Sequence, residues 1–360
     1  MRIFQNYQIV KRQEPALIIK FLFFSVSILV SLLFSAVLIK VAGADLKEAA
    51  VSLLSGAFWG KREILETLVK STPLMFTGLA TAIAFRAKIW NIGQEGQLFG
   101  GAMMSYLAYS LFAGENVILN VMISLIAGLM GGALTGLIPA ILKIHFRVDE
   151  VLSTVILNYI IAYFLSFMLS PLGPWRQQGS FYQQTSLINE AAKWPMLFEE
   201  YRLHIGFIIA LMAAVLLYII MKKLPLGYEI RAFGYNSTAA ETQGISSASI
   251  ILATLLLSGG LAGLAGVGEV FGAEFRLTSR ISPGYGFSGI IVAIVGGLNP
   301  LGVVLASIFF GGLLNGAVRL KVTTNVPNAL IDVIQATVLI ALLISRVLMT
   351  YRIRRKIHVE

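Results

Sequence analysis

Amide and hydroxyl side chains gather at two places inside otherwise apolar stretches of the sequence. Such groups donate and accept hydrogen bonds without ionising near neutral pH, so they suit contact with a polar, uncharged molecule better than acid–base chemistry. An asparagine within an apolar span is costly unless it is hydrogen-bonded, which makes Asn158 the sharpest candidate. Its alternative role is a hydrogen bond between helices that touches no bound molecule. The candidates are Asn91, Gln94 and Gln97 in the first stretch and Ser153, Thr154, Asn158 and Tyr159 in the second.

No catalytic or metal-binding constellation accompanies these residues. Cysteine is absent, and His145, His204 and His358 lie far apart without the spacing of metal ligands. The segment GAFWGKR at 56–62 is one residue short of a phosphate-binding loop and has Arg62 where that loop needs a hydroxyl residue. We therefore expect no enzymatic activity, no metal and no cofactor in this chain, and any ATP hydrolysis must come from a separate subunit.

Membrane-spanning helices are the elements that must position the polar residues. Of the 360 residues, 57% are apolar and 13% are charged, about half the charged fraction of soluble domains. Lipid solvates the outer faces of helices, so a bilayer accommodates the apolar surface that a soluble fold could not bury. We predict an all-α, polytopic bundle of about ten transmembrane helices in one domain over 1–360, with an N-terminal anchor helix at 20–42 and a core at 65–350. Apolar runs of roughly 20 residues predict the further spans near 67–86, 93–113, 117–142, 150–171, 203–221, 248–269, 301–319 and 327–347.

A break interrupts the charge-free run at 281–318. The residues GLNP at 297–300 combine glycine and proline, which together end a helix. The run is therefore expected to form a short segment near 285–297 and then a full span. Broken helices often line a cavity, so Phe287 and Ser288 on the short segment are candidates for contact with a bound molecule. Simple packing is the alternative.

The loop at 222–249 has the features of a capped short helix. Pro225 and Gly227 are expected to end the span before it. Asn236 or Ser237 can then cap the start of a helix, and Gly244 can terminate that helix.

Basic residues indicate the orientation of the chain. In a ten-span arrangement, 16 lysine and arginine residues fall on the side of the two termini and 12 on the other side. The positive-inside rule then places both termini in the cytoplasm. The net charge of +10 comes from residues that flank spans, so nucleic acid is not an expected partner.

Three stretches of the sequence resemble a known family. They are FRAKIWNIGQEGQLFGGAMMS at 85–105, RVDEVLSTVILNYIIAYF at 147–164 and GYGFSGIIVAIVGGLNPLGVVLASIFFGGLLNG at 284–316. Together they resemble the ABC permeases that serve branched-chain amino acids, ribose-type sugars and nucleosides. The pattern DEVLSTVILNYI is narrower, and it resembles the branch that imports nucleosides delivered by a lipoprotein of the basic-membrane-protein type.

The resemblance implies a permease subunit of an ATP-driven importer in the bacterial plasma membrane. Its implied partners are an ATPase subunit with two nucleotide sites, a second and usually different permease chain, and an extracellular lipoprotein that binds the substrate. This chain is similar to the longer of the two permeases. The loop at 222–249 resembles the coupling helix that docks on the ATPase, with Arg231, Asn236, Glu241 and Gly244 as candidate contact residues. A solvated loop that contacts nothing is the alternative.

The sequence leaves alternatives open for the substrate and for the class of transporter. A nucleoside carries no net charge and needs hydrogen-bonding groups and aromatic faces, which the candidate pathway residues offer. A sugar or branched-chain amino acid permease of the same family is the nearest alternative, and the scarcity of charge in the inner spans argues against amino acids. A stand-alone secondary transporter is a further alternative, which the lack of a buried acid–base chain disfavours.

Overall fold

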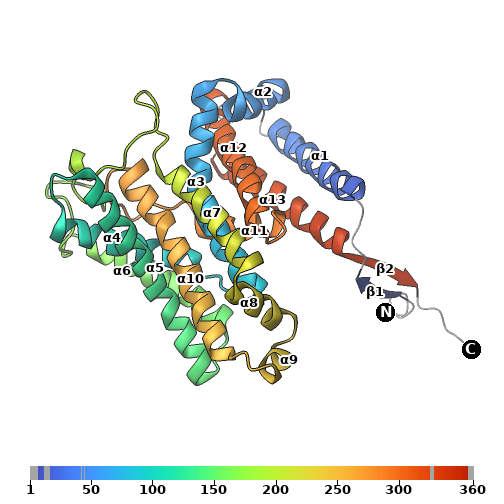
Figure 1. Cartoon of the computed structure of the whole chain (residues 1–360). Helices are drawn as coiled ribbons and strands as arrows, with labels where there is room; N and C mark the ends of the chain where they lie inside the picture. Colours follow the sequence, from blue (N-terminus) through green and yellow to red (C-terminus); the bar gives the residue numbers. More distant parts are fainter. Residues whose placement is uncertain (1–6, 12–16, 42, 44, 325–327, 356–360) are drawn as a thin grey trace, which may run out of the picture. The chain divides into compact units, whose positions relative to one another are not determined.

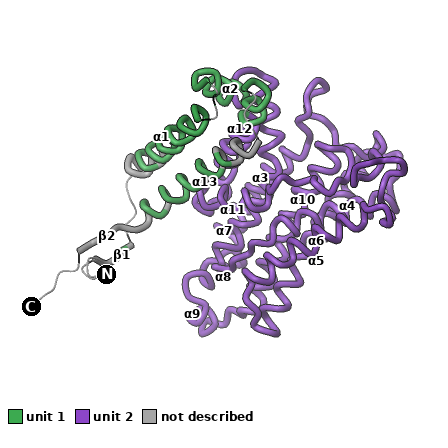
Figure 2. Tube along the Cα trace, turned by 180° about the vertical axis from the view of Figure 1, so that it is seen from behind, with its two compact units in different colours: residues 1–56, 316–360 green, residues 57–315 purple. Residues whose placement is uncertain are grey.

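The computed structural model describes residues 7–11, 17–41, 43, 45–324 and 328–355 of the chain. Helices make up most of it (Figure 1). The chain divides into two compact units, one formed by 1–56 with 316–360 and the other by 57–315 (Figure 2). The expectation of a single transmembrane domain over 1–360 stays a prediction.

The first unit brings the two ends of the chain together. Its helix α1 packs along α13, and strands β1 and β2 pair antiparallel with Tyr7 opposite Arg355. This short strand pair was not expected from the sequence, whereas α1 confirms the helix predicted near 20–42. The unit contains β1 (Tyr7–Lys11), α1 (Leu17–Val41), most of α2 (Leu46–Phe58), the end of α12 (Pro300–Thr324), α13 (Asn328–Thr350) and β2 (Tyr351–Arg355).

The second unit is a helical bundle built around α10. This helix packs against α3, α4 and α5, while α11 packs against α3 and α6 packs against α4. The unit contains α3 (Lys61–Arg86), α4 (Gln94–Phe112), α5 (Val117–Phe146), α6 (Glu150–Met168), η2 (Glu190–Ala192), α7 (Gly206–Lys223), α8 (Pro225–Tyr235), α9 (Ser237–Thr242), α10 (Ser247–Val267), η3 (Gly268–Ala273), α11 (Tyr285–Val295) and the first part of α12.

Six helices in the described part of the chain are long and apolar enough to cross a membrane. They are α3, α5, α6, α7, α10 with its continuation η3, and α12. Three shorter apolar helical stretches lie at 25–41, 285–295 and 336–349. The chain is thus a helical membrane protein, and the number of crossings, expected to be about ten, stays a prediction.

Close backbone contact joins α5 to α10. A Cβ atom built on Gly132 of α5 would lie 2.1 Å from the carbonyl oxygen of Gly259 on α10. Only glycine leaves room for this approach, which brings the two backbones into van der Waals contact where the hydrophobic effect gives helices little reason to associate. The α5–α10 pair therefore forms a fixed frame for the helices around it.

The predicted break at GLNP is confirmed, because α11 ends at Val295 and α12 begins at Pro300. The loop at 222–249 differs from expectation, because Pro225 and Gly227 both lie in a separate helix, α8, which follows the end of α7 at Lys223. Pro225 occupies the first turn of α8, where its missing N–H costs nothing. The second helix, α9, follows as predicted, and the Asn236 side chain caps it by accepting a hydrogen bond from Ala239 N–H at 3.1 Å.

The loop between α6 and α7 folds back onto the end of α10. Trp194 donates its backbone N–H to Phe271 O at 2.9 Å and its indole N–H to Ser124 Oγ at 3.0 Å. His204 stacks edge-on against Trp194 and is 1% exposed. Its Nδ1 accepts the Gly206 N–H at 3.1 Å, so the imidazole is held in a neutral form at the base of this loop.

Candidate functional site

A non-helical segment joins α3 to α4 and buries alternate residues in the second unit. It comprises residues 87–93, and its Ala87, Ile89 and Asn91 side chains are at most 1% exposed. Backbone groups that lie inside a membrane bundle without helical partners must find other hydrogen bonds. The neighbouring helix α6 supplies several of them.

Asn158 of α6 bonds to both ends of the turn that starts α4. Its Nδ2 donates to Ile92 O at 2.8 Å, and its Oδ1 accepts the Gly96 N–H at 2.7 Å. The Gly96 N–H is one of the first-turn donors that have no partner within a helix, and Gly93 at the cap position provides no side chain. Asn158 therefore caps α4 from a different helix.

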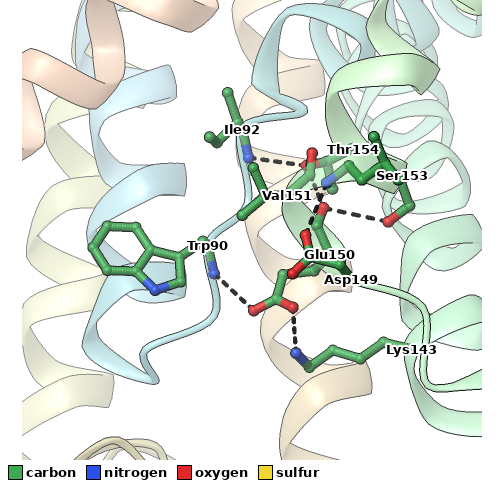
Figure 3. Close-up of polar contacts among 9 residues, drawn as sticks. Trp90, Ile92, Lys143, Asp149, Glu150, Val151, Ser153 and Thr154 are labelled. Carbon is green, nitrogen blue, oxygen red and sulfur yellow. Dashed lines mark hydrogen bonds and ion pairs between the residues drawn. The ribbon is translucent and has the colours of Figure 1, made fainter.

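Glu150 and Thr154 continue this contact along the same face of α6, at successive intervals of four residues. Thr154 Oγ1 accepts the Ile92 N–H at 3.2 Å, and Glu150 Oε1 accepts the Trp90 N–H at 3.4 Å (Figure 3). The other carboxylate oxygen of Glu150 forms an ion pair with Lys143, near the end of α5 (Figure 3). The segment 87–93 is thus tied to the α5–α6 corner as well as to the middle of α6.

Asn91 is the centre of a buried amide cluster. Its Nδ2 donates to Gln97 Oε1 at 3.1 Å and to Ser258 Oγ at 2.9 Å. Its Oδ1 accepts the Gly93 N–H at 2.9 Å. Ser258 in turn donates to Ala80 O at 2.7 Å, which extends the cluster from α10 to α3.

Gln94 and Glu95 begin α4 with different partners. Gln94 Nε2 donates to Asn91 O at 2.8 Å, while its Oε1 is buried and has no hydrogen-bond partner among the described residues. Glu95 Oε2 accepts the Gly286 N–H at 2.7 Å, so it anchors the start of α11. The first turn of α4 therefore holds α6 through Gly96 and α11 through Glu95.

The remaining pathway candidates lie outside this hydrogen-bonded interior. Tyr159 is 59% exposed and Phe287 is 43% exposed. Ser153 and Ser288 are partly exposed, and Ser153 Oγ bonds to Glu150 O at 3.3 Å. Tyr159 directly follows Asn158, and Phe287 directly follows Gly286. Both of these preceding residues contact the first turn of α4.

Three candidate contact residues of the 222–249 loop, Asn236, Glu241 and Gly244, border two grooves that share Lys143, whereas Arg231 lines a different cavity. One groove, of about 640 Å³, is lined by Lys143, Arg147, Glu241 and Gly244 among others. The other, of about 440 Å³, includes Lys143, Lys88 and Asn236 in its lining. The Glu241 carboxylate bonds to the Ser247 hydroxyl, and Gly244 has a left-handed φ of 84° that ends α9.

Three residues of this network carried no distinctive signal in the sequence. Glu150 follows the helix cap Asp149, where an acidic residue is ordinary. Lys143 stood out only as one basic residue near a span end, and Ser258 lies in a glycine-rich span that indicates packing. What could have directed attention to Glu150 is its spacing of four and eight residues from Thr154 and Asn158.

Comparison with known proteins identifies the family. The permease component of the branched-chain amino acid transport system matches residues 63–343. This chain belongs to that permease family. As a member, it is a transport subunit of the ABC class and contributes the membrane-crossing part.

Similar permeases are known from bacteria and from an archaeon. The guanosine ABC transporter permease protein NupP of Bacillus subtilis is 35% identical over 91% of this permease and 93% of its own length. The nucleoside ABC transporter permease protein NupB of Lactococcus lactis subsp. cremoris is 31% identical over 80% of each chain. The glucose ABC transporter permease protein TsgB13 of Haloferax volcanii is 30% identical over 81% of this permease and 78% of its own length. No solved structure matches this permease.

Proposed function

We propose that this permease carries nucleosides into the cytoplasm as part of an ATP-driven importer. The observation that carries the proposal is the absence of charge along α6 after Glu150, beside the start of α4. No charged residue occurs in the sequence from 151 to 175, and the one acid in the first turn of α4, Glu95, is already bonded to α11. A surface of aromatic rings and hydroxyls suits a neutral solute with a planar base.

The candidate residues divide into two roles under this proposal. Asn91 and Gln97 bond to each other, and Asn91 and Asn158 bond to backbone groups, so these side chains hold the segment 87–93 and the start of α4 in place. Tyr159 and Phe287 have exposed rings and directly follow residues that contact the first turn of α4. They line the pathway once a second permease chain covers this surface. Replacing Tyr159 with leucine should then reduce uptake several-fold, whereas phenylalanine at the same position should retain most of it. Equal uptake by both variants would contradict a role for the ring.

Energy must come from partners, because the sequence has no complete phosphate-binding loop. The partners are an ATPase subunit with two nucleotide sites, a second and different permease chain, and an extracellular lipoprotein that binds the substrate. The ATPase docks at α8 and α9, and its movement reaches the segment 87–93 through Lys143, Glu150 and the Trp90 N–H. Lys143 suits this role because it borders both grooves beside α9.

The coupling role is tested by Glu241→Arg in proteoliposomes that contain the complete importer. Uptake should fall several-fold while the amount of permease stays unchanged, because the reversed charge disturbs the surface beside α9. Thr242→Arg, which adds a charge next to it without removing the carboxylate, serves as the matched control. Wild-type uptake and ATP hydrolysis in the Glu241→Arg importer would show that Glu241 makes no coupling contact.

The substrate is tested by uptake of labelled guanosine, uridine, glucose and leucine in cells that express the importer with and without this permease. Nucleoside uptake that depends on the permease is the expected result. Glucose uptake without nucleoside uptake would favour the sugar alternative, which the 30% identity to the glucose permease supports. Leucine uptake alone would contradict the argument from missing charge.

The orientation follows from the basic residues and is also a proposal. Both termini lie in the cytoplasm of a bacterium, with the permease in its plasma membrane. Cysteines introduced at Gln5 and Val359 should resist a membrane-impermeant maleimide in intact cells and react after the cells are opened. Labelling of either position from outside would overturn this orientation.

A further inference from the structure

A cavity of about 350 Å³ lies at the end of the second unit where α3 and α7 end and α12 begins. Three basic side chains line it: Arg86 from α3, Lys222 from α7 and Arg231 from α8. No carboxylate belongs to the lining, and among the described residues none of the three cations forms an ion pair. Three cations around one cavity without a counter-charge favour an anionic occupant.

Local contacts fix where these charges lie. Arg86 Nε donates to Leu298 O at 3.1 Å, which holds the guanidinium at the cavity and leaves its terminal nitrogens available. Lys222 Nζ lies 4.6 Å from the centre of the Tyr218 ring. Arg86 and Arg231 are half-buried, and Lys222 is exposed. The cavity is thus a partly enclosed cationic site with one cation at its edge.

Apart from Asn299, the remaining side chains of the lining are largely apolar. Tyr218, Met221 and Pro300 complete much of the lining. Beside the cavity, α7 exposes Val215 and Ile219 by 51% and 40%, and α12 exposes the leucine at position 305 by 71%. These residues belong to helices that are long and apolar enough to cross a membrane. An occupant with an anionic head and an apolar tail would therefore satisfy both parts of this surface.

We propose that this cavity binds the headgroup of an anionic phospholipid, with the acyl chains lying along α7 and α12. Basic cavities between the ends of membrane helices are suited to such headgroups, because phosphate pairs with arginine and lysine while the hydrocarbon stays in the bilayer. The bound lipid would connect α3, α7, α8 and α12 at the end of the bundle that carries the coupling loop. Its presence would stabilise the relative positions of these elements without taking part in transport chemistry.

The test uses the purified full-length permease, freed of lipid in a neutral detergent. Phosphatidylglycerol, phosphatidylcholine and inorganic phosphate are added separately, and thermal unfolding and native mass spectrometry report binding. Phosphatidylglycerol should stabilise the permease and remain bound, and the other two should do so much less. Neutralising one cation should weaken phosphatidylglycerol binding by about fivefold, and neutralising each further cation should weaken it by a similar factor.

Matched variants separate this cavity from general surface charge. Lys222→Gln, a change at an exposed position that the fold tolerates, should weaken phosphatidylglycerol binding, and the further change Arg86→Gln should weaken it again. The control is Lys223→Gln, which removes the same charge at the next position, outside the cavity, and it should bind as the parent does.

Three results would overturn the proposal. The first is unchanged phosphatidylglycerol binding in Lys222→Gln. The second is equal stabilisation by inorganic phosphate, which would mean a site for free anions. The third is a double variant, Lys222→Gln with Arg86→Gln, that binds phosphatidylglycerol as the parent does but loses the ATPase during purification of the importer. That result would assign the cations to a contact with the ATPase.

Discussion

Replacing Asn158 with leucine separates a structural role of this residue from contact with substrate. Leucine has the same number and branching of side-chain heavy atoms and fits the same helix, but it offers no hydrogen bond. The change leaves the Gly96 N–H and the Ile92 carbonyl without the partners that lie at 2.7 and 2.8 Å in the folded chain. The Gly96 N–H in the first turn of α4 would lose the side chain that caps it.

The size of the effect follows from these two bonds. A hydrogen bond between membrane helices contributes about 0.6 to 2 kcal/mol, and a buried group left unpaired costs about 1 to 3 kcal/mol. Because Gly96 is buried and Ile92 is only partly buried, the carbonyl can recover some hydration. We therefore expect Asn158→Leu to lower the free energy of unfolding by about 2 to 4 kcal/mol.

Unfolding in mixed micelles, followed by circular dichroism, measures this loss, and uptake by the reconstituted importer is measured in parallel. Tyr159→Leu is the matched control for stability, because its side chain is 59% exposed and should change the free energy of unfolding by less than about 0.5 kcal/mol. Normal stability combined with lost uptake in Asn158→Leu would refute the structural assignment and favour direct contact with substrate.

Other parts of the structure yield further predictions. Lys143→Gln should lower ATP-driven uptake several-fold in proteoliposomes, and the charge swap Lys143→Glu with Glu150→Lys should restore most of it; no recovery in the swap would argue against the ion pair as the link. Gly132→Ala places a Cβ 2.1 Å from a carbonyl oxygen of α10 and should lower Tm in detergent by several degrees, whereas Gly114→Ala, with no atom within 4 Å, should leave Tm unchanged; equal Tm values would refute the tight crossing. Burial, assisted by a nearby arginine charge, lowers the pKa of His204 from 6.5 to about 4. Between these two pKa values the unfolded chain binds a proton at His204 and the folded chain does not. The contribution of His204 to the free energy of unfolding should therefore be constant above pH 6.5 and should fall by about 3 kcal/mol as the pH falls to about 4. His204→Gln should flatten that decline in a pH series of unfolding measurements, and a decline of the same size in the variant would contradict the assignment.

Some features of this permease follow from the sequence because their causes are local. Apolar runs identify helices that can cross a membrane, since the free energy of transfer to lipid depends on residue type and length. The break before Pro300 and the capped helix after Asn236 also follow locally, because proline and a capping side chain act on backbone groups within a few residues. The signal at Pro225 was ambiguous, because proline both ends one helix and suits the first turn of another.

The division of roles among the polar residues was decided only by the tertiary structure. The sequence marks both Asn158 and Tyr159 as candidates for contact with a bound molecule, yet Asn158 is 3% exposed and caps a distant helix while Tyr159 is 59% exposed. The partners of Asn158 lie 62 and 66 positions away along the chain. A hydrogen bond depends on which helices are neighbours and how each is rotated, and neither is contained in the composition of a single span. The sequence therefore determined that this chain crosses a membrane and where its helices break, while helix packing decided which polar groups face one another and which remain open to a second molecule.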